Sequence, residues 1–316
     1  MTEPLREPRP FSLRAWMELL RVPNLFTVPG DPLAGFLIAS TRGPAANLLC
    51  VLPAVGAALC LYSAGLITND RFDLEEDRRD RPRRPLPSGR VSTRAAVAVA
   101  LILIALGVAL AAVAGLLSCA VAATLAVMMV LYNAWAKRVP VLGPLVMGLC
   151  RGLSVMLGVA AAAQPNSMNL ALSIIAASGI TLYIFTVTFV ASRETTGRAP
   201  GYVAMAPGIV MLLFLFFISS WAIRLQYVTG NPPLPAMIGY VLAFVTGTYV
   251  GTRGLGIRRK TAPADIAAGI GTFIRALIPA QAVLALDGAF PGYWVGSCLI
   301  LLWPISVLVG RKFYSS

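Results

Sequence analysis

Long apolar runs recur along the whole chain, separated by short polar stretches. Each run is about 20 residues long, which is the length that an α-helix needs to cross the hydrocarbon core of a bilayer. The pattern predicts an all-α, polytopic membrane bundle of nine or ten transmembrane helices. No stretch of soluble character remains for a second domain, so we expect a single domain over residues 1–316. To within a few residues, the ten runs are 22–40, 47–68, 95–117, 119–136, 141–163, 169–190, 204–223, 236–251, 266–286 and 292–310.

The composition agrees with this pattern and excludes several kinds of chemistry. Hydrophobic residues make up 58% of the chain and charged residues 12%, against roughly 45–50% and about 25% in soluble domains. The chain has no histidine, which excludes haem or zinc sites built on histidine and a histidine general base. Its five cysteines are dispersed without a CxxC pair, so we expect reduced core residues.

The net charge of +13 would favour nucleic-acid binding in a soluble protein, but here the basic residues lie in short loops. If the N-terminus is cytoplasmic, 22 of the 26 lysines and arginines fall on that side and only Arg42 and Arg224 on the other. The positive-inside rule then puts the loops 69–94 and 191–203 on one cytoplasmic face. We therefore expect membrane lipids, and no nucleic acid, as the surroundings of this protein.

Two further arginines, Arg151 and Arg275, lie inside apolar runs. Inserting a charge at such depth costs at least ~2.5–3.5 kcal/mol, so such residues normally face a partner or a wet cavity. We expect both to line a cavity. Snorkelling, or a purely structural pairing with another helix, is the alternative.

An acidic cluster follows the second apolar run. Six of the thirteen acidic residues lie between Asp70 and Asp80. If the helix continues to Asp80, steps of about 100° place Asp70, Asp73, Asp77 and Asp80 on one face. Crowded carboxylates repel one another unless cations lie between them, and Mg²⁺ with a substrate diphosphate is the natural candidate. The alternative is a solvated loop whose acids simply pair with the arginines from Arg71 to Arg94.

The next segment, Arg81 to Ser92, combines arginines with three of the chain's prolines. The prolines end the helix, and the arginines could contact a phosphate-bearing substrate. Attraction of this basic segment to anionic lipid is the competing interpretation.

Together these residues resemble the UbiA superfamily of intramembrane prenyltransferases. The N-D-x-x-D-x-x-x-D motif is met at Asn69, Asp70, Asp73 and Asp77, and a basic R-P-L-P-S-G segment follows at 83–89. The run Leu131-Tyr-Asn-Ala-Trp-Ala-Lys-Arg138 is similar to the family's Tyr and Lys/Arg signature. The resemblance implies about nine helices around a cavity open to lipid. It also implies Mg²⁺-dependent transfer of an isoprenoid group from a prenyl diphosphate to an aromatic, quinone-precursor or lipid-like acceptor, at the cytoplasmic side of a bacterial inner membrane.

The chain departs from the family where a second aspartate-rich motif normally follows helix six. The corresponding loop, 192–201, has Glu194 as its only acid. The Arg-Glu pair there and the glycine-rich segment 143–152 resemble the branch of the superfamily encoded in Ebo-type bacterial gene clusters.

The resemblance assigns roles residue by residue. Asp70, Asp73 and Asp77 would bind Mg²⁺, with Asn69 orienting the first carboxylate. Arg84, Lys137 and Arg193 would neutralise the leaving diphosphate, and Glu194 is a candidate proton acceptor. Asn24, Tyr132, Asn133 and Arg151 would orient donor or acceptor, unless they are ordinary polar residues of helix interfaces.

Two other functions stay open. A non-catalytic or weakly catalytic carrier of a prenyl-diphosphate-like lipid is favoured by the missing second motif. An intramembrane terpene cyclase would ionise the same donor without an acceptor.

Overall fold

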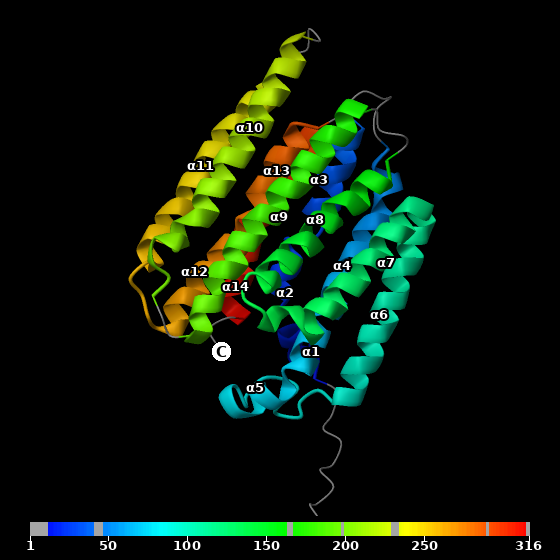
Figure 1. Cartoon of the computed structure of the whole chain (residues 1–316). Helices are drawn as coiled ribbons and strands as arrows, with labels where there is room; N and C mark the ends of the chain where they lie inside the picture. Colours follow the sequence, from blue (N-terminus) through cyan, green and yellow to red (C-terminus); the bar gives the residue numbers. More distant parts are fainter. Residues whose placement is uncertain are drawn as a thin grey trace, which may run out of the picture.

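Apolar runs of the sequence fold into helices long enough to cross a bilayer. The computed structural model describes residues 12–40, 47–162, 167–196, 199–228, 234–288 and 291–313, and within these ranges all regular structure is helical. Nine helical segments of this described part meet the length and hydropathy of a membrane span. The all-α membrane bundle is therefore confirmed, and the protein is a multi-pass integral membrane protein (Figure 1). The α-helices are α1 (Leu13–Leu19), α2 (Val22–Leu25), α3 (Gly30–Ala39), α4 (Leu52–Phe72), α5 (Leu74–Asp80), α6 (Thr93–Ala114), α7 (Leu116–Ala134), α8 (Leu142–Ala160), α9 (Ser167–Thr196), α10 (Ala206–Val228), α11 (Leu234–Ile257), α12 (Pro263–Arg275), α13 (Leu277–Leu286) and α14 (Gly292–Phe313), and three 3₁₀ turns are η1 (Leu48–Val51), η2 (Ala136–Arg138) and η3 (Gly201–Met205).

The first apolar run is broken near its start and does not form one long helix. Pro23 lies at the start of α2, and Pro29 caps α3 after a short turn. Proline lacks the backbone N–H of a helix interior, so the run forms two short helices instead of one long one. In Figure 1, α1 and α2 lie near the lower end of the bundle and α3 in its upper half. In the described part of the chain, nine of the ten runs correspond to candidate membrane spans, and one of these, Pro263–Leu286, is divided into α12 and α13 at Ala276. The first run gives no such span, and its α3 is buried along almost its whole length.

The broken segment lies close to the centre of the bundle because small residues allow close packing. A Cβ on Gly158 of α8 would lie 1.8 Å from the Pro32 carbonyl oxygen of α3, and one on Gly35 would lie 2.1 Å from the Val155 carbonyl oxygen. Close backbone approach through small residues is a common way for membrane helices to pack. One glycine on each helix, Gly35 of α3 and Gly158 of α8, therefore allows the two helices to pack closely.

Replacing Gly158 by alanine is expected to destabilise the bundle by about 1–3 kcal/mol, the usual cost of overpacking. The intrinsic helix propensity of alanine works in the opposite direction by about 1 kcal/mol, so only the clash with α3 can lower stability. Thermal unfolding in detergent measures the effect. Gly251→Ala is the matched control, since a Cβ there meets nothing within 4 Å, and an equal loss in both variants would contradict the packing argument.

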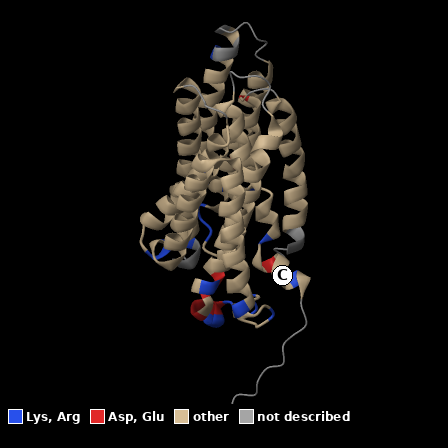
Figure 2. Cartoon of the chain, turned by 90° about the vertical axis from the view of Figure 1, so that its right-hand side faces the viewer, with Lys and Arg blue, Asp and Glu red and all other residues tan. Residues whose placement is uncertain are grey.

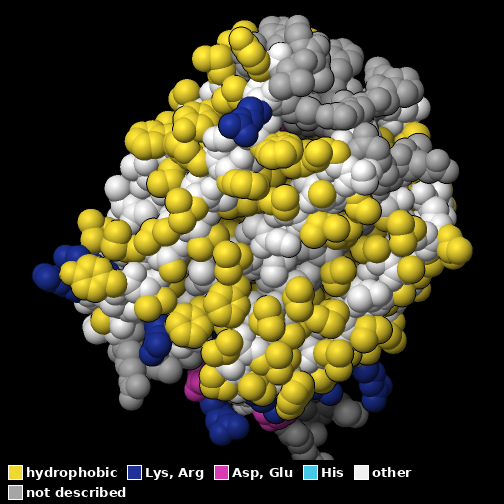
Figure 3. Space-filling model, turned by 45° about the horizontal axis from the view of Figure 1, so that its top comes forward, with side chains coloured by type: hydrophobic (Ala, Val, Ile, Leu, Met, Phe, Trp, Pro, Cys, Tyr) yellow, Lys and Arg dark blue, Asp and Glu magenta, His cyan; other side chains and the backbone are white. Residues whose placement is uncertain are grey.

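The surface of the bundle is that of a membrane protein with one highly charged end. Large hydrophobic side chains such as Leu101, Leu213 and Phe244 are exposed, and hydrophobic groups are spread over the face seen in Figure 3. Most charged residues drawn in Figure 2 gather at the lower end, where α5 and the end of α9 also lie in Figure 1. The loops that the charge pattern placed together are therefore at the same end of the molecule.

The cysteine prediction holds only in part. All five cysteines are free, but Cys50 and Cys298 are exposed and none of the others is fully buried. In a bilayer these small apolar side chains can face lipid at little cost, so the bundle does not need them in its core.

Candidate active site

A cavity of about 320 Å³ opens between α2, α4, α7, α8, α9 and α12. Its walls are largely apolar, with Leu61, Leu125, Ile184 and Ile274 among them. Apolar walls with a few placed polar groups are typical of small-molecule sites. The polar residues that line it include Arg21, Asn24, Asn69, Tyr132, Asn133, Arg151 and Ser154.

The acidic motif lies where α4 ends and the chain turns into α5. The predicted continuous helix is wrong at one residue, because Asp73 has φ −89° and ψ 3° and separates the two helices. The turn keeps its backbone bonds: the Asp73 N–H donates to Asn69 O at 3.0 Å, and the Asp77 N–H donates to Asp73 O at 2.8 Å. The single face predicted for four aspartates is therefore divided, and Asp80 is exposed.

Asp70 and Asp77 nevertheless converge on one shared arginine, Arg84, and Asp70 also bonds Arg21. Arg21 donates from Nη2 to Asp70 Oδ1 at 2.8 Å, and Arg84 donates from Nη1 to Asp77 Oδ2 at 2.7 Å. The same Arg84 Nη1 lies 3.9 Å from Asp70 Oδ1. Both carboxylates are almost fully buried, with side chains 5% and 6% exposed. Paired, charge-assisted bonds offset the cost of burying these carboxylates.

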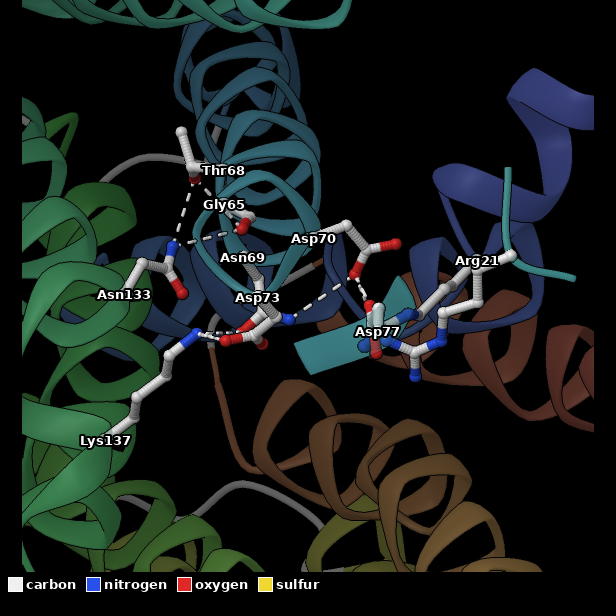
Figure 4. A network of polar contacts seen from close by, with 10 residues as sticks. Arg21, Gly65, Thr68, Asn69, Asp70, Asp73, Asp77, Asn133 and Lys137 are labelled. Carbon is white, nitrogen blue, oxygen red and sulfur yellow. Dashed lines mark hydrogen bonds and ion pairs between the residues drawn. The ribbon is translucent and has the colours of Figure 1, made fainter. Parts of the chain in front are cut away.

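Asp73 has a different partner. The Lys137 ammonium donates to Asp73 Oδ1, and it lies 3.4 Å from Asn69 Oδ1 (Figure 4). The Lys137 ammonium group thus lies between the side-chain oxygens of Asn69 and Asp73. In this structure arginine and lysine side chains supply the positive charge around the three aspartates. Binding of Mg²⁺ at this motif stays a prediction.

Asn133 joins α7 to α4. Its Nδ2 donates to Gly65 O and to Thr68 Oγ1, both at 3.1 Å (Figure 4). These bonds fix the end of α7, one turn before Lys137. The side chain lines the cavity, but its observed contacts are those of a helix-interface residue, which was the alternative considered for it.

Arg21 is a residue of this site that the sequence pattern did not single out. It was counted among the topology signals, yet it lines the cavity and bonds Asp70, 49 positions further along the chain. Its φ of 44° is in the left-handed region, which is costly for a non-glycine residue and frequent at functional sites. The Val-Pro that follows Arg21 marks a helix start, but no local signal reveals its partner.

Asp31 was also missed, although an acid inside an apolar run is itself a signal. It is fully buried, and its Oδ2 lies 2.9 Å from Arg151 Nη2. Arg151 lines the cavity, as expected, and a structural pairing accompanies that position. Arg275 is not among the residues that line this cavity.

The end of α9 lies beside the cavity. Thr188 and Ala191 line the cavity, while the Arg193 guanidinium lies over the Phe189 ring at 5.6 Å. Glu194 lies in α9, but its side chain is outside the described part of the structure. Asn24 and Tyr132 do line the cavity; what these residues bind stays a prediction.

Oxygen atoms are the donors that this site offers to a metal. Over the described residues, no group of three or more acidic or cysteine side chains is close enough to hold a metal ion as it stands. The three aspartates instead hold Arg21, Arg84 and Lys137. Carboxylate and amide oxygens suit a hard cation such as Mg²⁺, and ammonium and guanidinium groups already occupy positions where a cation is stabilised.

The fold and the site together define a membrane-embedded, apolar cavity that is closed at its charged end by an Asn-Asp motif with basic partners. Residues 32–207, more than half of the chain, match the UbiA prenyltransferase family, and the chain belongs to that family.

Named relatives and solved structures agree with this assignment. The chain is 36% identical over 153 residues to the digeranylgeranylglyceryl phosphate synthase of Methanopyrus kandleri, which covers 48% of this chain and 55% of that protein. It is 28% identical over 239 residues to the enzyme of the same name from Saccharolobus solfataricus, covering 74% and 81%. It thus aligns with about half the length of the first relative. A UbiA homologue from Archaeoglobus fulgidus bound to GPP and Mg²⁺ shares the fold, with a TM-score of 0.58, 16% identity and coverage of 86% and 99%.

Proposed function

We propose that this protein is a Mg²⁺-dependent intramembrane prenyltransferase, which moves an isoprenoid group from a prenyl diphosphate to an acceptor. The observation that carries the proposal is that Asp70, Asp73 and Asp77 are each bonded to a basic side chain and adjoin the apolar cavity. Asn69 of the same motif and Arg21, the partner of Asp70, line that cavity. The whole chain would act as one domain. The Ebo-type branch stays a prediction, since the relatives named above are archaeal.

Asp70, Asp73 and Asp77 would hold the metal, with Asn69 contributing its amide oxygen. When bound, Mg²⁺ would supply positive charge to the diphosphate, and the A. fulgidus homologue bound to GPP and Mg²⁺ supports this assignment. The negative charge that develops on a departing diphosphate is what such a site needs to stabilise.

The basic side chains have a second task in this proposal. Arg21, Arg84 and Lys137 release their carboxylates and donate to diphosphate oxygens, which is bidentate chemistry for the two arginines. The allylic C–O bond then breaks, and its electron pair leaves with the diphosphate. The apolar walls around Leu61 and Ile184 keep water from the allylic cation.

The acceptor completes the reaction by forming a new bond to the allylic carbon. Its displaced proton passes to the diphosphate or to a carboxylate, for which Glu194 remains a candidate, because the chain has no histidine. The names of the archaeal relatives support a lipid acceptor with a glycerol backbone. Asn24, Tyr132 and Asn133 would orient the ligands from the cavity wall, and Arg193 would approach the diphosphate from α9.

The topology proposal follows the charge distribution. The basic and acidic loops would face the cytoplasm, in a bacterial inner membrane or its archaeal equivalent, because lysines and arginines favour that side.

A carrier of a prenyl-diphosphate-like lipid is the second candidate function. The loop 192–201 has a single acid, so a second carboxylate group that would help to activate the donor is missing from it.

Diphosphate release from purified protein in nanodiscs separates the two functions. With Mg²⁺ and a panel of prenyl diphosphates, an enzyme releases diphosphate and yields a prenylated acceptor. Mg²⁺-dependent donor binding with release at background would favour the carrier. A hydrocarbon or terpene alcohol formed without added acceptor would indicate a cyclase instead.

Lys137→Gln is expected to lower diphosphate release about 10- to 100-fold, because a charge-bearing partner of Asp73 and Asn69 is lost. Release kinetics at saturating Mg²⁺ measure this. The neighbouring Arg138 is exposed, and Arg138→Gln serves as the matched control with release close to wild type. An equal effect of both substitutions would show that general surface charge, rather than the position of Lys137, governs release.

A further inference from the structure

A second polar cluster lies on the cavity wall, apart from the acidic motif. Arg151 of α8 lines the cavity and is only 6% exposed. Its Nη2 donates to Thr27 O at 2.8 Å and lies 2.9 Å from Asp31 Oδ2. Gln281 of α13 donates from Nε2 to Thr27 O at 2.7 Å and to Asp31 Oδ1. Three segments that are remote in the sequence, residues 27–31, α8 and α13, thus meet in this cluster.

The orientation of Arg151 is further restricted by an aromatic ring. Its guanidinium carbon lies 5.7 Å from the centroid of Tyr62, which also lines the cavity. A guanidinium held by an ion pair, a carbonyl and an aromatic face loses little freedom when a ligand binds, which is the advantage of a preorganised site.

This cluster has hydrogen-bonding capacity that the protein does not use. Arg151 Nε, Asp31 Oδ2 and Gln281 Oε1 are buried without a hydrogen-bond partner in the part of the chain that the structure describes. Arg151 and Asp31 therefore form an ion pair in which the Oδ2 atom of Asp31 is not aligned to accept a hydrogen bond. Buried polar groups without partners are costly, above all in a membrane, and each needs an explanation. Of the three residues only Arg151 lines the cavity, so a ligand oxygen can reach it.

The charge of the cluster restricts that ligand. Asp31, which is fully buried, neutralises Arg151, so the pair offers a hydrogen-bond donor without net positive charge. An anionic ligand group would approach the Asp31 carboxylate in surroundings where charges are weakly screened. A hydroxyl or carbonyl oxygen meets no such repulsion.

The prenyl donor does not explain this second cluster. Its diphosphate belongs with the acidic motif, and the rest of the donor is hydrocarbon that gains nothing from a guanidinium. On the basis of the proposed function, we propose that Arg151, held by Asp31 and the Thr27 carbonyl, binds an uncharged hydroxyl or carbonyl oxygen of the acceptor and so selects acceptors that are neutral at that position.

The test uses two pairs of probes whose members differ only in an anionic group. The pairs are 4-hydroxybenzyl alcohol with 4-hydroxybenzoate, and a 1-O-alkylglycerol with its phosphate. Binding is measured calorimetrically to the full chain in nanodiscs, with Mg²⁺ and a non-hydrolysable thiolodiphosphate donor analogue present. For wild type we expect the neutral member of at least one pair to bind tenfold or more tightly than its anionic partner.

Variants assign this preference to the cluster. The double variant Asp31→Asn/Arg151→Met keeps the pair uncharged and is expected to lose tenfold or more in affinity for the neutral probe. Asp31→Asn alone leaves the Arg151 charge uncompensated, so it is expected to shift the preference at least tenfold toward the anionic probe. Arg275→Met is the matched control, since this arginine also lies in an apolar segment but does not line the cavity, and its probe affinities should equal those of wild type.

The outcomes decide between a binding role and a structural one. Unchanged affinity for both neutral probes in the double variant, or no binding of either neutral probe to wild type, would overturn the proposal. So would an anionic preference in wild type. Binding of the donor analogue to each variant shows that its cavity is intact. If wild type released diphosphate from no donor, the proposed transferase function would be refuted. Probe binding that depends on Arg151 would still be a valid result, because it is measured without turnover.

Discussion

Exchanging Asp70 and Asp77 together for asparagine is expected to lower Mg²⁺-dependent diphosphate release by about a thousandfold or more. Removing a single group that stabilises developing charge typically costs about 10²–10³ in rate, and this variant removes two buried carboxylates at once. Both side chains lie within 4 Å of the Arg84 guanidinium, at 3.9 and 2.7 Å, so the change also frees that arginine. Release of diphosphate over a Mg²⁺ titration is the measurement.

Asp80→Asn is the control for this experiment. It is the same chemical change three residues after Asp77, at an exposed position beyond the ion pairs, and its release should equal that of wild type. Donor binding should weaken together with release in the double variant. Release that survives in the double variant at saturating Mg²⁺ would mean that the motif does not hold the metal, and the assignment of Asp70 and Asp77 would be wrong.

Arg151→Met is expected to be the most destabilising single substitution of the cavity wall, with a loss of about 3–5 kcal/mol in the free energy of unfolding. The reason is that Asp31, with an exposure of 0%, would keep a charge that nothing compensates. The double variant Asp31→Asn/Arg151→Met removes both charges and should recover most of the loss. Reversible unfolding of Arg151→Met, Asp31→Asn and the double variant in mixed micelles completes the double-mutant cycle.

Arg253→Met provides a reference for the loss of an arginine as such. Its guanidinium lies over the Tyr249 ring at 5.3 Å, and the residue is exposed, so its removal should change stability by about 0.5 kcal/mol or less. If the double variant were as unstable as Arg151→Met, the loss would come from packing around Arg151 rather than from its charge pair.

Patterns within short stretches of the sequence were sufficient to predict the helices and the acidic motif of the site. Runs of about 20 apolar residues leave a chain in lipid no alternative to helices, because every backbone polar group must find its partner inside the same segment. The spacing of Asp70, Asp73 and Asp77 places them within two turns of chain at a membrane boundary. Lys137 was identified through the resemblance to the family, because the run 131–138 is similar to its Tyr and Lys/Arg signature.

Local pattern failed where a residue depends on a partner far away in the chain. Arg21 resembles any other basic residue before a span, and only its contact with Asp70 distinguishes it. Asp31 and Gln281 are 250 positions apart. The break at Asp73 has no proline or glycine to announce it, since its sequence reads Arg-Phe-Asp-Leu-Glu.

The sequence by itself determined that the chain forms a bundle of membrane helices, that its charged end carries an Asn-Asp motif, and that no histidine chemistry is available. These properties depend on composition and on spacing within a few turns. Only the tertiary structure decided which cation each aspartate holds, that α5 turns away from α4, and that Asp31, Arg151 and Gln281 meet on one cavity wall. Such contacts join segments that are remote in the chain, and they form because buried charges are stable only where the packed helices bring their partners within bonding distance.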